Sequence, residues 1–318
     1  MAALRRTRLA TILTVTLSPT LDISTAADEI VHTRKIRCDA AEVQAGGGGV
    51  NVARVARRLG ADVSAIVTAG GANGERLLTL LVQEGLAPVS VPVEGETRES
   101  FTVTERRSGQ QYRFVLPGQA LSAREIEGVL GALADTSPAP RFVVLSGSLP
   151  SGPLADLPAR IADAATAAGA GFIVDGPADV LAATRGADLV KPNALELGDL
   201  VGTSLATREE IVRAARSVIE RGISAAVLVS LGEDGAVLVT ADEAFAYRVP
   251  QVQLVSAVGA GDSMVGALTA ALAQGATLVD AAAMGAAAGA AAILTPGTQL
   301  CHREDVLRLL GQITVNRI

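Results

Sequence analysis

Residues 141–176 read RFVVLSGSLPSGPLADLPARIADAATAAGAGFIVDG, a pattern of strand, helix and strand. The two ends are short apolar runs bounded by glycine, and the middle has the length and composition of a helix. Similar apolar runs predict further strands at Thr11–Leu17, Val63–Gly70, Asp188–Asn193 and Ala225–Gly232. This alternation predicts an α/β fold, with a mostly parallel central sheet and helices on both faces.

Two segments, residues 23–44 and 96–117, break the alternation with short strand candidates interrupted by polar residues. Ser108 and Gly109 in the second segment predict a hairpin turn. We therefore expect a separate small β-sheet, which could cover a site at the strand ends as a lid. The alternative is a hairpin without a functional role.

The composition excludes several classes of protein. The 318-residue chain has a net charge of −6 and no basic stripe, so no nucleic-acid partner is expected. Cys38 and Cys301 have no metal-ligand spacing, and a cytoplasmic protein is the expectation. The apolar run after Arg5–Arg8 is interpreted as a first strand rather than a signal peptide. The alanine-rich run near Ala281–Leu294 is shorter than the about 20 residues of a membrane span, so no membrane segment is expected.

An acidic residue follows a glycine-rich turn in SAVGAGDSMVGALTAALAQG, residues 256–275. Gly259, Ala260 and Gly261 leave backbone N–H groups unobstructed at a helix N-terminus, which suits the charge of a transferred phosphoryl group. Asp262 follows in the first turn, where its carboxylate could accept the proton of an attacking substrate hydroxyl. The alternative is that Asp262 only stabilises the helix dipole.

Four consecutive glycines precede a predicted helix in AGGGGVNVARVARRLG, residues 45–60. Such a loop lets the backbone approach a polyhydroxyl ligand, and Asn51 offers both a donor and an acceptor. The segment has neither the Lys-Ser/Thr ending of a P-loop nor the GxGxxG pattern of dinucleotide-binding folds. A flexible turn remains the alternative.

Polar residues also follow several of the predicted strands. They are Asp22, Ser146, Ser148, Lys191, Asn193, Glu196, Ser230 and Gly232. Ligands of open parallel sheets bind beyond the carboxyl ends of the strands, so these residues are expected to converge. Singly, each could be a cap or turn residue.

In this order the motifs resemble those of the ribokinase-like, PfkB-type carbohydrate kinases over nearly the whole chain. The similar segments are TLSPTLD (16–22), GGGGVNVAR (46–54), TAGGANGE (68–75), SGSLPSG (146–152), LVKPNALEL (189–197), SLGEDGA (230–236), VGAGDSMVGA (258–267) and AAAILTPGT (290–298). Four more segments resemble the 6-phosphofructokinases of this family: KIRC (35–38), TRES (97–100), QYRFVLPG (111–118) and TQLC (298–301). The resemblance implies a single ribokinase-like kinase domain, residues 1–318, with a lid formed by 23–44 and 96–117.

The resemblance also implies roles for individual residues in the phosphorylation of fructose 6-phosphate by ATP. Asp262 would be the base, next to an anion hole at Gly259, Ala260 and Gly261. The sugar hydroxyls would contact Asp22, Gly47, Gly48 and Asn51, and the sugar's phosphate would lie near Arg98 and Ser148. Lys191 and Asn193 would face the ATP phosphates, while Ser230, Gly232 and Gly235 would line the nucleotide. Lys35 would reach a nucleotide or the neighbouring subunit of a homodimer joined through the lid.

Two metal ions are implied as well. Glu196 would organise Mg²⁺ through water. A monovalent cation, K⁺, would bind mostly backbone carbonyls of two segments that the resemblance places side by side. These carbonyls belong to Ser256, Val258, Ala292, Thr295, Gly297 and Gln299. A water molecule or an ordinary loop hydrogen bond could take the place of the cation.

Two positions depart from the family pattern. Relatives that act on fructose 1-phosphate or tagatose 6-phosphate commonly carry lysine where this chain has Gly48, which favours fructose 6-phosphate. Gln299 stands where close relatives often have arginine. The competing functions are a 1-phosphofructokinase, a tagatose-6-phosphate kinase or a free-sugar kinase, and, from another class, a non-catalytic sugar-phosphate sensor.

Overall fold

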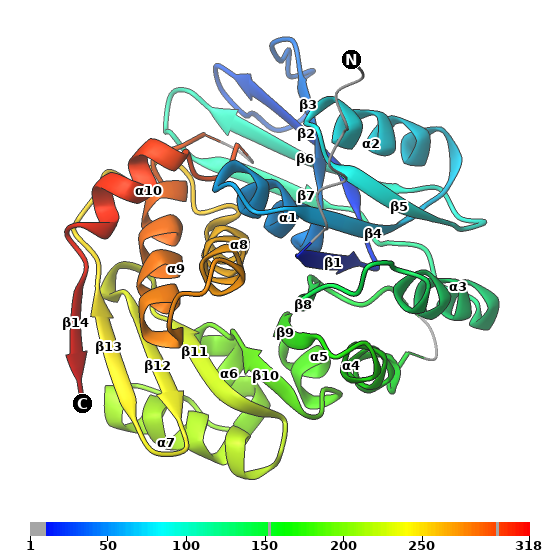
Figure 1. Ribbon diagram of the computed structural model, residues 1–318. Helices are drawn as coiled ribbons and strands as arrows, with labels where there is room; N and C mark the ends of the chain where they lie inside the picture. The colour runs from blue at the N-terminus through cyan, green and yellow to red at the C-terminus, as the bar shows by residue number, and fades with distance from the viewer. Residues whose placement is uncertain (1–10, 152–153, 297–298) are drawn as a thin grey trace, which may run out of the picture.

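The structure consists of two β-sheets and the helices that pack against them (Figure 1). It is a computed structural model that describes residues 11–151, 154–296 and 299–318. Within these ranges the larger sheet has the strand order β14-β13-β12-β11-β10-β9-β8-β1-β4-β5. Its strands are β1 (Ile12–Thr16), β4 (Val63–Ala69), β5 (Ala87–Pro92), β8 (Phe142–Ser146), β9 (Gly171–Asp175), β10 (Ala187–Val190), β11 (Ser224–Ser230), β12 (Ala236–Thr240), β13 (Ala244–Arg248) and β14 (Thr314–Arg317).

The strands from β5 to β11 in this order are parallel, and β12, β13 and β14 are antiparallel additions at one edge. The mostly parallel sheet is therefore confirmed. Strand β10 ends at Val190, before the predicted limit, because Pro192 lacks a backbone N–H and Asn193 caps the next helix. Strand β5 was not predicted, since its prolines obscure a strand pattern that only an edge position tolerates.

Helices cover both faces of the larger sheet. One face carries α3 (Ala123–Ala134), α4 (Leu157–Ala167), α5 (Ala178–Ala182), α6 (Ala194–Val201) and α7 (Arg208–Glu220). The other carries α1 (Gly48–Arg58), α2 (Gly71–Gln83), α8 (Ala260–Ala273) and α9 (Leu278–Ala292), while α10 (Arg303–Leu310) packs on α9. No helix in the described ranges is both long and apolar enough to cross a bilayer.

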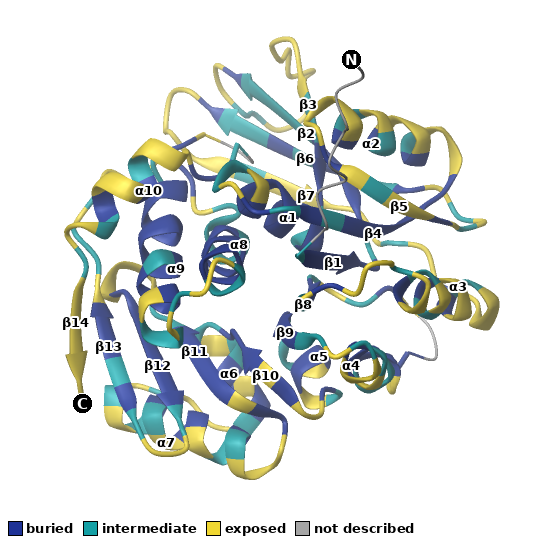
Figure 2. Cartoon of the chain, in the orientation of Figure 1, coloured by how far each residue is buried: buried dark blue, intermediate teal, exposed yellow. Residues whose placement is uncertain are grey.

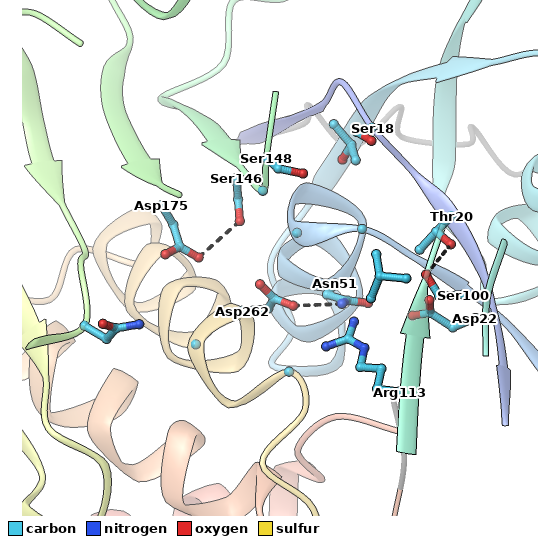
Figure 3. A pocket seen from close by; sticks show the side chains of 18 of the residues that line it. Ser18, Thr20, Asp22, Asn51, Ser100, Arg113, Ser146, Ser148, Asp175 and Asp262 are labelled. Carbon is cyan, nitrogen blue, oxygen red and sulfur yellow. Dashed lines mark hydrogen bonds between the residues drawn. The ribbon is translucent and has the colours of Figure 1, made fainter. Parts of the chain in front are cut away.

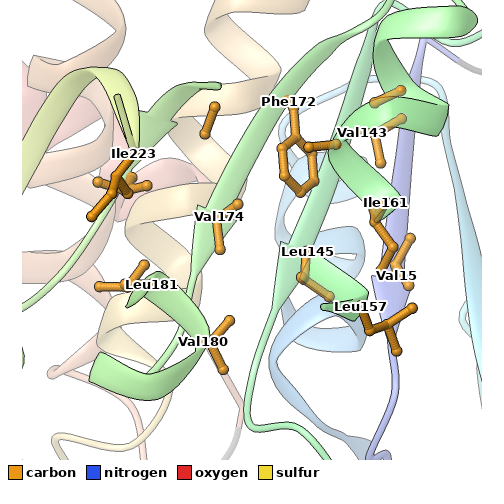
Figure 4. Close-up of a cluster of buried hydrophobic side chains, with 14 of the residues drawn as sticks. Val15, Val143, Leu145, Leu157, Ile161, Phe172, Val174, Val180, Leu181 and Ile223 are labelled. Carbon is orange, nitrogen blue, oxygen red and sulfur yellow. The ribbon is translucent and has the colours of Figure 1, made fainter. Parts of the chain in front are cut away.

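The apolar core lies between these layers, and the inner strands of the larger sheet are almost entirely buried, whereas the edge strands β5 and β14 are mostly exposed (Figure 2). On the face of α4, Leu157 and Ile161 pack against Val15 and Leu145 of the sheet (Figure 4). Large side chains of this kind contribute about 1.5–3 kcal/mol each when fully buried. A core of mostly aliphatic residues thus holds the strand ends in fixed positions.

The smaller sheet has the order β3-β2-β6-β7 and lies over one end of the larger sheet (Figure 1). Its strands are β2 (Thr20–Ala27), β3 (Glu42–Gly46), β6 (Arg98–Glu105) and β7 (Gln111–Val115). Strands β6 and β7 form the predicted hairpin, and Gly109 in its turn has a φ of 71°, which favours glycine. The second sheet is therefore confirmed, and we call it the lid.

Candidate active site

A cavity of about 490 Å³ lies between the carboxyl ends of the parallel strands and the lid (Figure 3). The N-terminal ends of α1 and α8 also border it. Most of the predicted site residues line this cavity: Asp22, Gly47, Gly48, Asn51, Arg98, Ser148, Lys191, Asn193, Glu196, Ser230, Gly259, Gly261 and Asp262. Residues from most of the chain length thus meet in one place.

Asp262 lies in the first turn of α8 and faces the start of α1 (Figure 3). The turn before it depends on Gly259, whose φ of 76° favours glycine. Nδ2 of Asn51 donates a hydrogen bond of 2.8 Å to Oδ2 of Asp262. Burial, and next the negative charge of Asp175, raise the pKa of Asp262 to about 7, although the Asn51 hydrogen bond acts against this. A carboxyl group with such a pKa is suited to act as a general base.

Lys191 is a buried cation directly after β10. Its Nζ lies 3.0 Å from Oδ1 of Asp175, which ends the neighbouring strand β9. Oγ of Ser146 on β8 donates to the other oxygen of this carboxylate over 3.2 Å. Burial alone would lower the pKa of Lys191, but attraction by Asp175 and two further carboxylates raises it overall. A Cβ added to Gly261 would lie 3.3 Å from Nζ, so the charged amine stands beside the N-terminus of α8.

The glycine loop before α1 packs tightly against the end of β8. Gly47 has a φ of 109°, a left-handed conformation that side chains disfavour. A Cβ on Gly48 would lie only 2.5 Å from Oγ of Ser146 and 2.6 Å from the backbone nitrogen of Gly147. Gly48 therefore admits no side chain with this backbone, and the loop presents main-chain groups and Asn51 to the cavity.

A buried carboxylate and two arginines lie at the lid end of the cavity. Burial raises the pKa of Asp22 to about 6, although Arg113 and Arg98 attract its charged form. Oδ1 of Asp22 and Nε of Arg98 are buried and have no hydrogen-bond partner among the described residues. Arg98 donates instead from Nη2 to the carbonyl of Ser18 over 3.1 Å. Acceptors and guanidinium groups in this arrangement suit a polyhydroxyl ligand with an anionic group.

A second cavity of about 600 Å³ adjoins the first, because Ser230 and Gly261 line both. The predicted residues Gly232, Gly235 and Ala260 line the second cavity. Most of its other lining residues are apolar or small: Val249, Pro250, Val252, Leu254, Ala257, Met264, Ala286, Gly289, Ala290 and Ile293. An apolar cavity with few polar groups, next to a site with a charged lysine, suits the base and ribose of a nucleotide.

Asn193 and Glu196 form a capping box at the start of α6. The backbone N–H of each donates to the side chain of the other, over 2.8 Å in both directions. Among the described residues no cluster of three or more acidic, histidine or cysteine side chains could hold a metal ion alone. Mg²⁺ bound to nucleotide phosphates needs only one or two carboxylates, so Glu196 fits that ion as it stands.

The two segments predicted to bind a monovalent cation lie side by side. The backbone N–H groups of Val255 and Ser256 both donate to the carbonyl of Ile293, over 2.8 and 3.3 Å. The N–H of Val258 donates to Oγ of Ser256 over 3.3 Å. The start of this loop is therefore tied to the end of α9.

The remaining predicted cation ligands follow α9. Thr295 is buried, and its Oγ1 donates to the carbonyl of Ala292 over 2.7 Å. The carbonyl of Gln299 accepts a hydrogen bond from Arg58. The Ala292 carbonyl also accepts from the backbone N–H of Thr295 over 3.1 Å, so both of its lone pairs are engaged, whereas the Gln299 carbonyl has a second lone pair. Gly297 lies outside the described residues.

Two charged side chains that line the first cavity were not predicted from the sequence: Asp175 and Arg113. Asp175 ends a predicted strand in GFIVDG, so the rule that selected the other strand-end residues would have found it. Arg113 lies within β7, and only the pairing of β7 with β6 turns it toward the cavity. Lys35 lies in the exposed connection between β2 and β3 and lines neither cavity.

The fold agrees with comparisons to known proteins. The model of the family described as "pfkB family carbohydrate kinase" matches residues 15–305. The chain is 43% identical over 298 residues to the ATP-dependent 6-phosphofructokinase isozyme 2 of Mycobacterium tuberculosis, covering 93% of this chain and 88% of that protein. It is 38% identical to the isozyme of Escherichia coli, covering 95% and 99% of the two chains.

A crystal structure of phosphofructokinase-2 from Escherichia coli in complex with potassium superimposes with a TM-score of 0.90. The identity is 38%, and the alignment covers 96% of this chain and 99% of the other. This chain belongs to the PfkB family of carbohydrate kinases. The ribokinase-like fold predicted from the motifs is thus confirmed, and the protein is an ATP-dependent kinase.

Proposed function

We propose that this protein transfers the terminal phosphoryl group of ATP to fructose 6-phosphate and forms fructose 1,6-bisphosphate. One observation carries the proposal: the Asp262–Asn51 pair stands between the Asp175 side of the cavity, with Lys191, and the lid side, with Arg113 (Figure 3). Two anionic substrates can therefore meet at one carboxylate. The names of the relatives at 38–43% identity agree with this substrate pair.

The reaction follows from these positions. Asp262 accepts the proton of the sugar's 1-hydroxyl as that oxygen forms a bond to the terminal phosphorus, and the bond from phosphorus to the ADP oxygen breaks. The N–H groups at Gly259, Ala260 and Gly261, together with Lys191, stabilise the charge on the transferred group. Glu196 would hold Mg²⁺ through water, with Asn193 nearby, and the bound ion would neutralise charge on the ATP phosphates.

The sugar and the nucleotide have separate binding residues in this proposal. Asp22, Asn51 and the backbone at Gly47 and Gly48 hold the sugar hydroxyls, and Ser148 lies near the sugar's phosphate. The second cavity, with Ser230, Gly232 and Gly235, holds the nucleotide. Lys35 on the exposed loop reaches the site of a neighbouring subunit.

The substrate can be tested with a coupled assay of ADP release in MgATP. Fructose 6-phosphate, fructose 1-phosphate, tagatose 6-phosphate and free hexoses are compared at equal concentrations. We expect the highest kcat/KM with fructose 6-phosphate, because Gly48 leaves no room for the lysine found in enzymes of the other two sugar phosphates. A preference for another acceptor contradicts the substrate, and no turnover with any of them favours a sensor.

Replacing Arg98 with alanine is expected to raise KM for fructose 6-phosphate roughly 10- to 100-fold, because a charge-assisted hydrogen bond contributes about 1.5–3 kcal/mol. KM for ATP should change little, since Arg98 does not line the nucleotide cavity. Steady-state kinetics with each substrate varied in turn measures both constants. Arg76→Ala, on the exposed face of α2, removes the same charge as a control. Equal increases for both substrates would contradict the role.

K⁺ is expected to raise turnover several-fold over tetramethylammonium at matched ionic strength. A cation bound to carbonyls of the loop at Ser256 and Val258 and of the segment at Ala292, Thr295 and Gln299 would fix the start of α8. Rates in KCl, NaCl and tetramethylammonium chloride measure the effect. Identical rates in the three salts would show that hydrogen bonds alone hold the loops.

The lid is proposed to join two copies of the chain. Phe114 and Leu116 at the end of the hairpin are 56% and 45% exposed, and Ile36 in the β2–β3 connection is 38% exposed. Exposed apolar side chains on the lid favour burial against a second copy. We expect a dimer by sedimentation velocity, and Phe114→Asp should shift it to monomer. A monomeric wild-type chain at micromolar concentration contradicts this assembly.

A further inference from the structure

A third cavity, of about 420 Å³, lies outside the active site. It is lined by Arg54, Arg57 and Arg58 of α1 and by Glu84 and Leu86, which follow α2. Residues three and four apart lie on one face of a helix, so the three guanidinium groups share this face of α1. We call this the arginine cavity.

The charges of the arginine cavity do not balance. Glu84 is its one acidic lining residue, and it pairs with Arg54 over 2.6 Å. Arg58 donates to the carbonyls of Gln299 and Cys301, which are neutral acceptors. Burial, and next the repulsion by Arg54, lower the pKa of Arg58. Three guanidinium groups of the lining therefore face one carboxylate, which leaves a surplus of two positive charges.

Arg57 is the exposed member of the three. A Cβ added to Gly85 would lie 2.6 Å from its Nη2, so the guanidinium lies along the Gly85 backbone at the mouth of the cavity. The absence of a side chain at Gly85 makes this position possible. Two of the arginines are thus fixed by hydrogen bonds inside the cavity, and the third is at its entrance.

We propose that the arginine cavity is a binding site for a small phosphate-bearing anion, separate from the ATP and sugar sites. Its volume is within the roughly 300–1,000 Å³ of small-molecule sites. The planar donors of arginine match phosphate oxygens in pairs, and burial strengthens such bonds. The surplus of positive charge supplies the attraction.

An anion in this cavity would act on the active site through α1. Arg58 binds the carbonyl of Gln299, in the segment proposed to hold K⁺, and the same helix carries Asn51 against Asp262. An anion that takes over N–H donors of Arg58 leaves fewer for the Gln299 carbonyl. The site is therefore placed to regulate turnover rather than to take part in the chemistry.

Calorimetric titration with inorganic phosphate tests the proposal. The enzyme is first loaded with one equivalent each of fructose 6-phosphate and a non-hydrolysable ATP analogue, so that phosphate does not report on the active site and no excess phosphate ester occupies the arginine cavity. We expect one phosphate per chain, and a Kd at least about tenfold higher in Arg57→Gln, since one charge-assisted pair is lost. Arg124→Gln, on the exposed start of α3, removes the same charge elsewhere and should leave Kd unchanged.

The kinetics of Arg57→Gln without phosphate should equal those of the wild type, because Arg57 contacts neither substrate cavity. A second titration with glycerol 3-phosphate distinguishes a phosphate ester from free phosphate as the natural anion. Absence of saturable phosphate binding in the enzyme loaded with one equivalent of each substrate overturns the proposal. Equal affinity in the wild type and Arg57→Gln overturns it too.

Discussion

Replacing Asp262 with asparagine is expected to lower kcat by at least about 10²-fold, the usual effect of losing a general base. The amide keeps the shape of the carboxylate but cannot accept the proton of the sugar hydroxyl. The KM for ATP should stay close to that of the wild type, because the phosphate and nucleotide residues are unchanged. Single-turnover kinetics with saturating substrates measures the loss. More than a third of the wild-type turnover in the variant would contradict the mechanism.

Stability gives an independent readout of the same substitution. The pKa of Asp262 is raised from 3.8 to about 7, so the folded state prefers the protonated carboxyl. The resulting stabilisation is complete below pH 3.8 and is lost as the pH rises to about 7. Asp262→Asn has no carboxyl to titrate, so its stability does not fall in this way. Urea unfolding should therefore show its free energy of unfolding increasing relative to that of the wild type from pH 3.8 to about 7. Asp242→Asn, in an exposed turn, is the control, and its free energy of unfolding should show no such increase relative to the wild type.

Replacing Lys191 with methionine is expected to lower kcat by about 10²–10³-fold, as removing one preorganised transition-state donor does. It should also destabilise the fold by about 3 kcal/mol, because Asp175 loses its buried partner. Activity assays and urea unfolding measure the two effects separately. If Lys191→Met kept more than a tenth of the wild-type turnover, the role of Lys191 would be limited to neutralising the charge of Asp175.

The double variant Lys191→Met with Asp175→Asn separates these roles. It removes both charges, so most of the lost stability should return. Turnover should stay low, because the amine beside the N-terminus of α8 is still missing. If activity returned together with stability, Lys191 would have a structural role only and would not stabilise the transition state.

The alternation of strands and helices could be predicted from the sequence because the inner parallel strands are buried on both faces. Runs such as TILTVTL and GFIVDG combine apolar residues with β-branched or glycine neighbours, and they form β1 and β9. Edge strands carry a weaker signal. Strand β14 is exposed along its length, and β5 contains two prolines, so neither pattern separates a strand from a loop.

The site residues could be predicted where a local rule selects them, as with Asp262 at a helix start and Lys191 at a strand end. The effects of these residues on one another, such as a shifted pKa or a lack of space for a side chain, could not be predicted. The pKa of Asp262 depends on Asp175, and the lack of space at Gly48 depends on Ser146, in each case a residue from a distant part of the chain. These contacts form only when the fold brings distant parts of the chain together, so a local sequence pattern carries no information about them.

The central pair of the lid has a consequence for the order of folding. Strand β2 pairs in parallel with β6, although β3, α1, β4, α2 and β5 lie between them in the chain. Closing so long a loop costs conformational entropy, and the cost falls when the intervening elements have already docked on the larger sheet. The lid should therefore assemble after the sheet beneath it. During native-state hydrogen exchange, amides of β6 and β7 should open at lower free energy than those of β1 and β8.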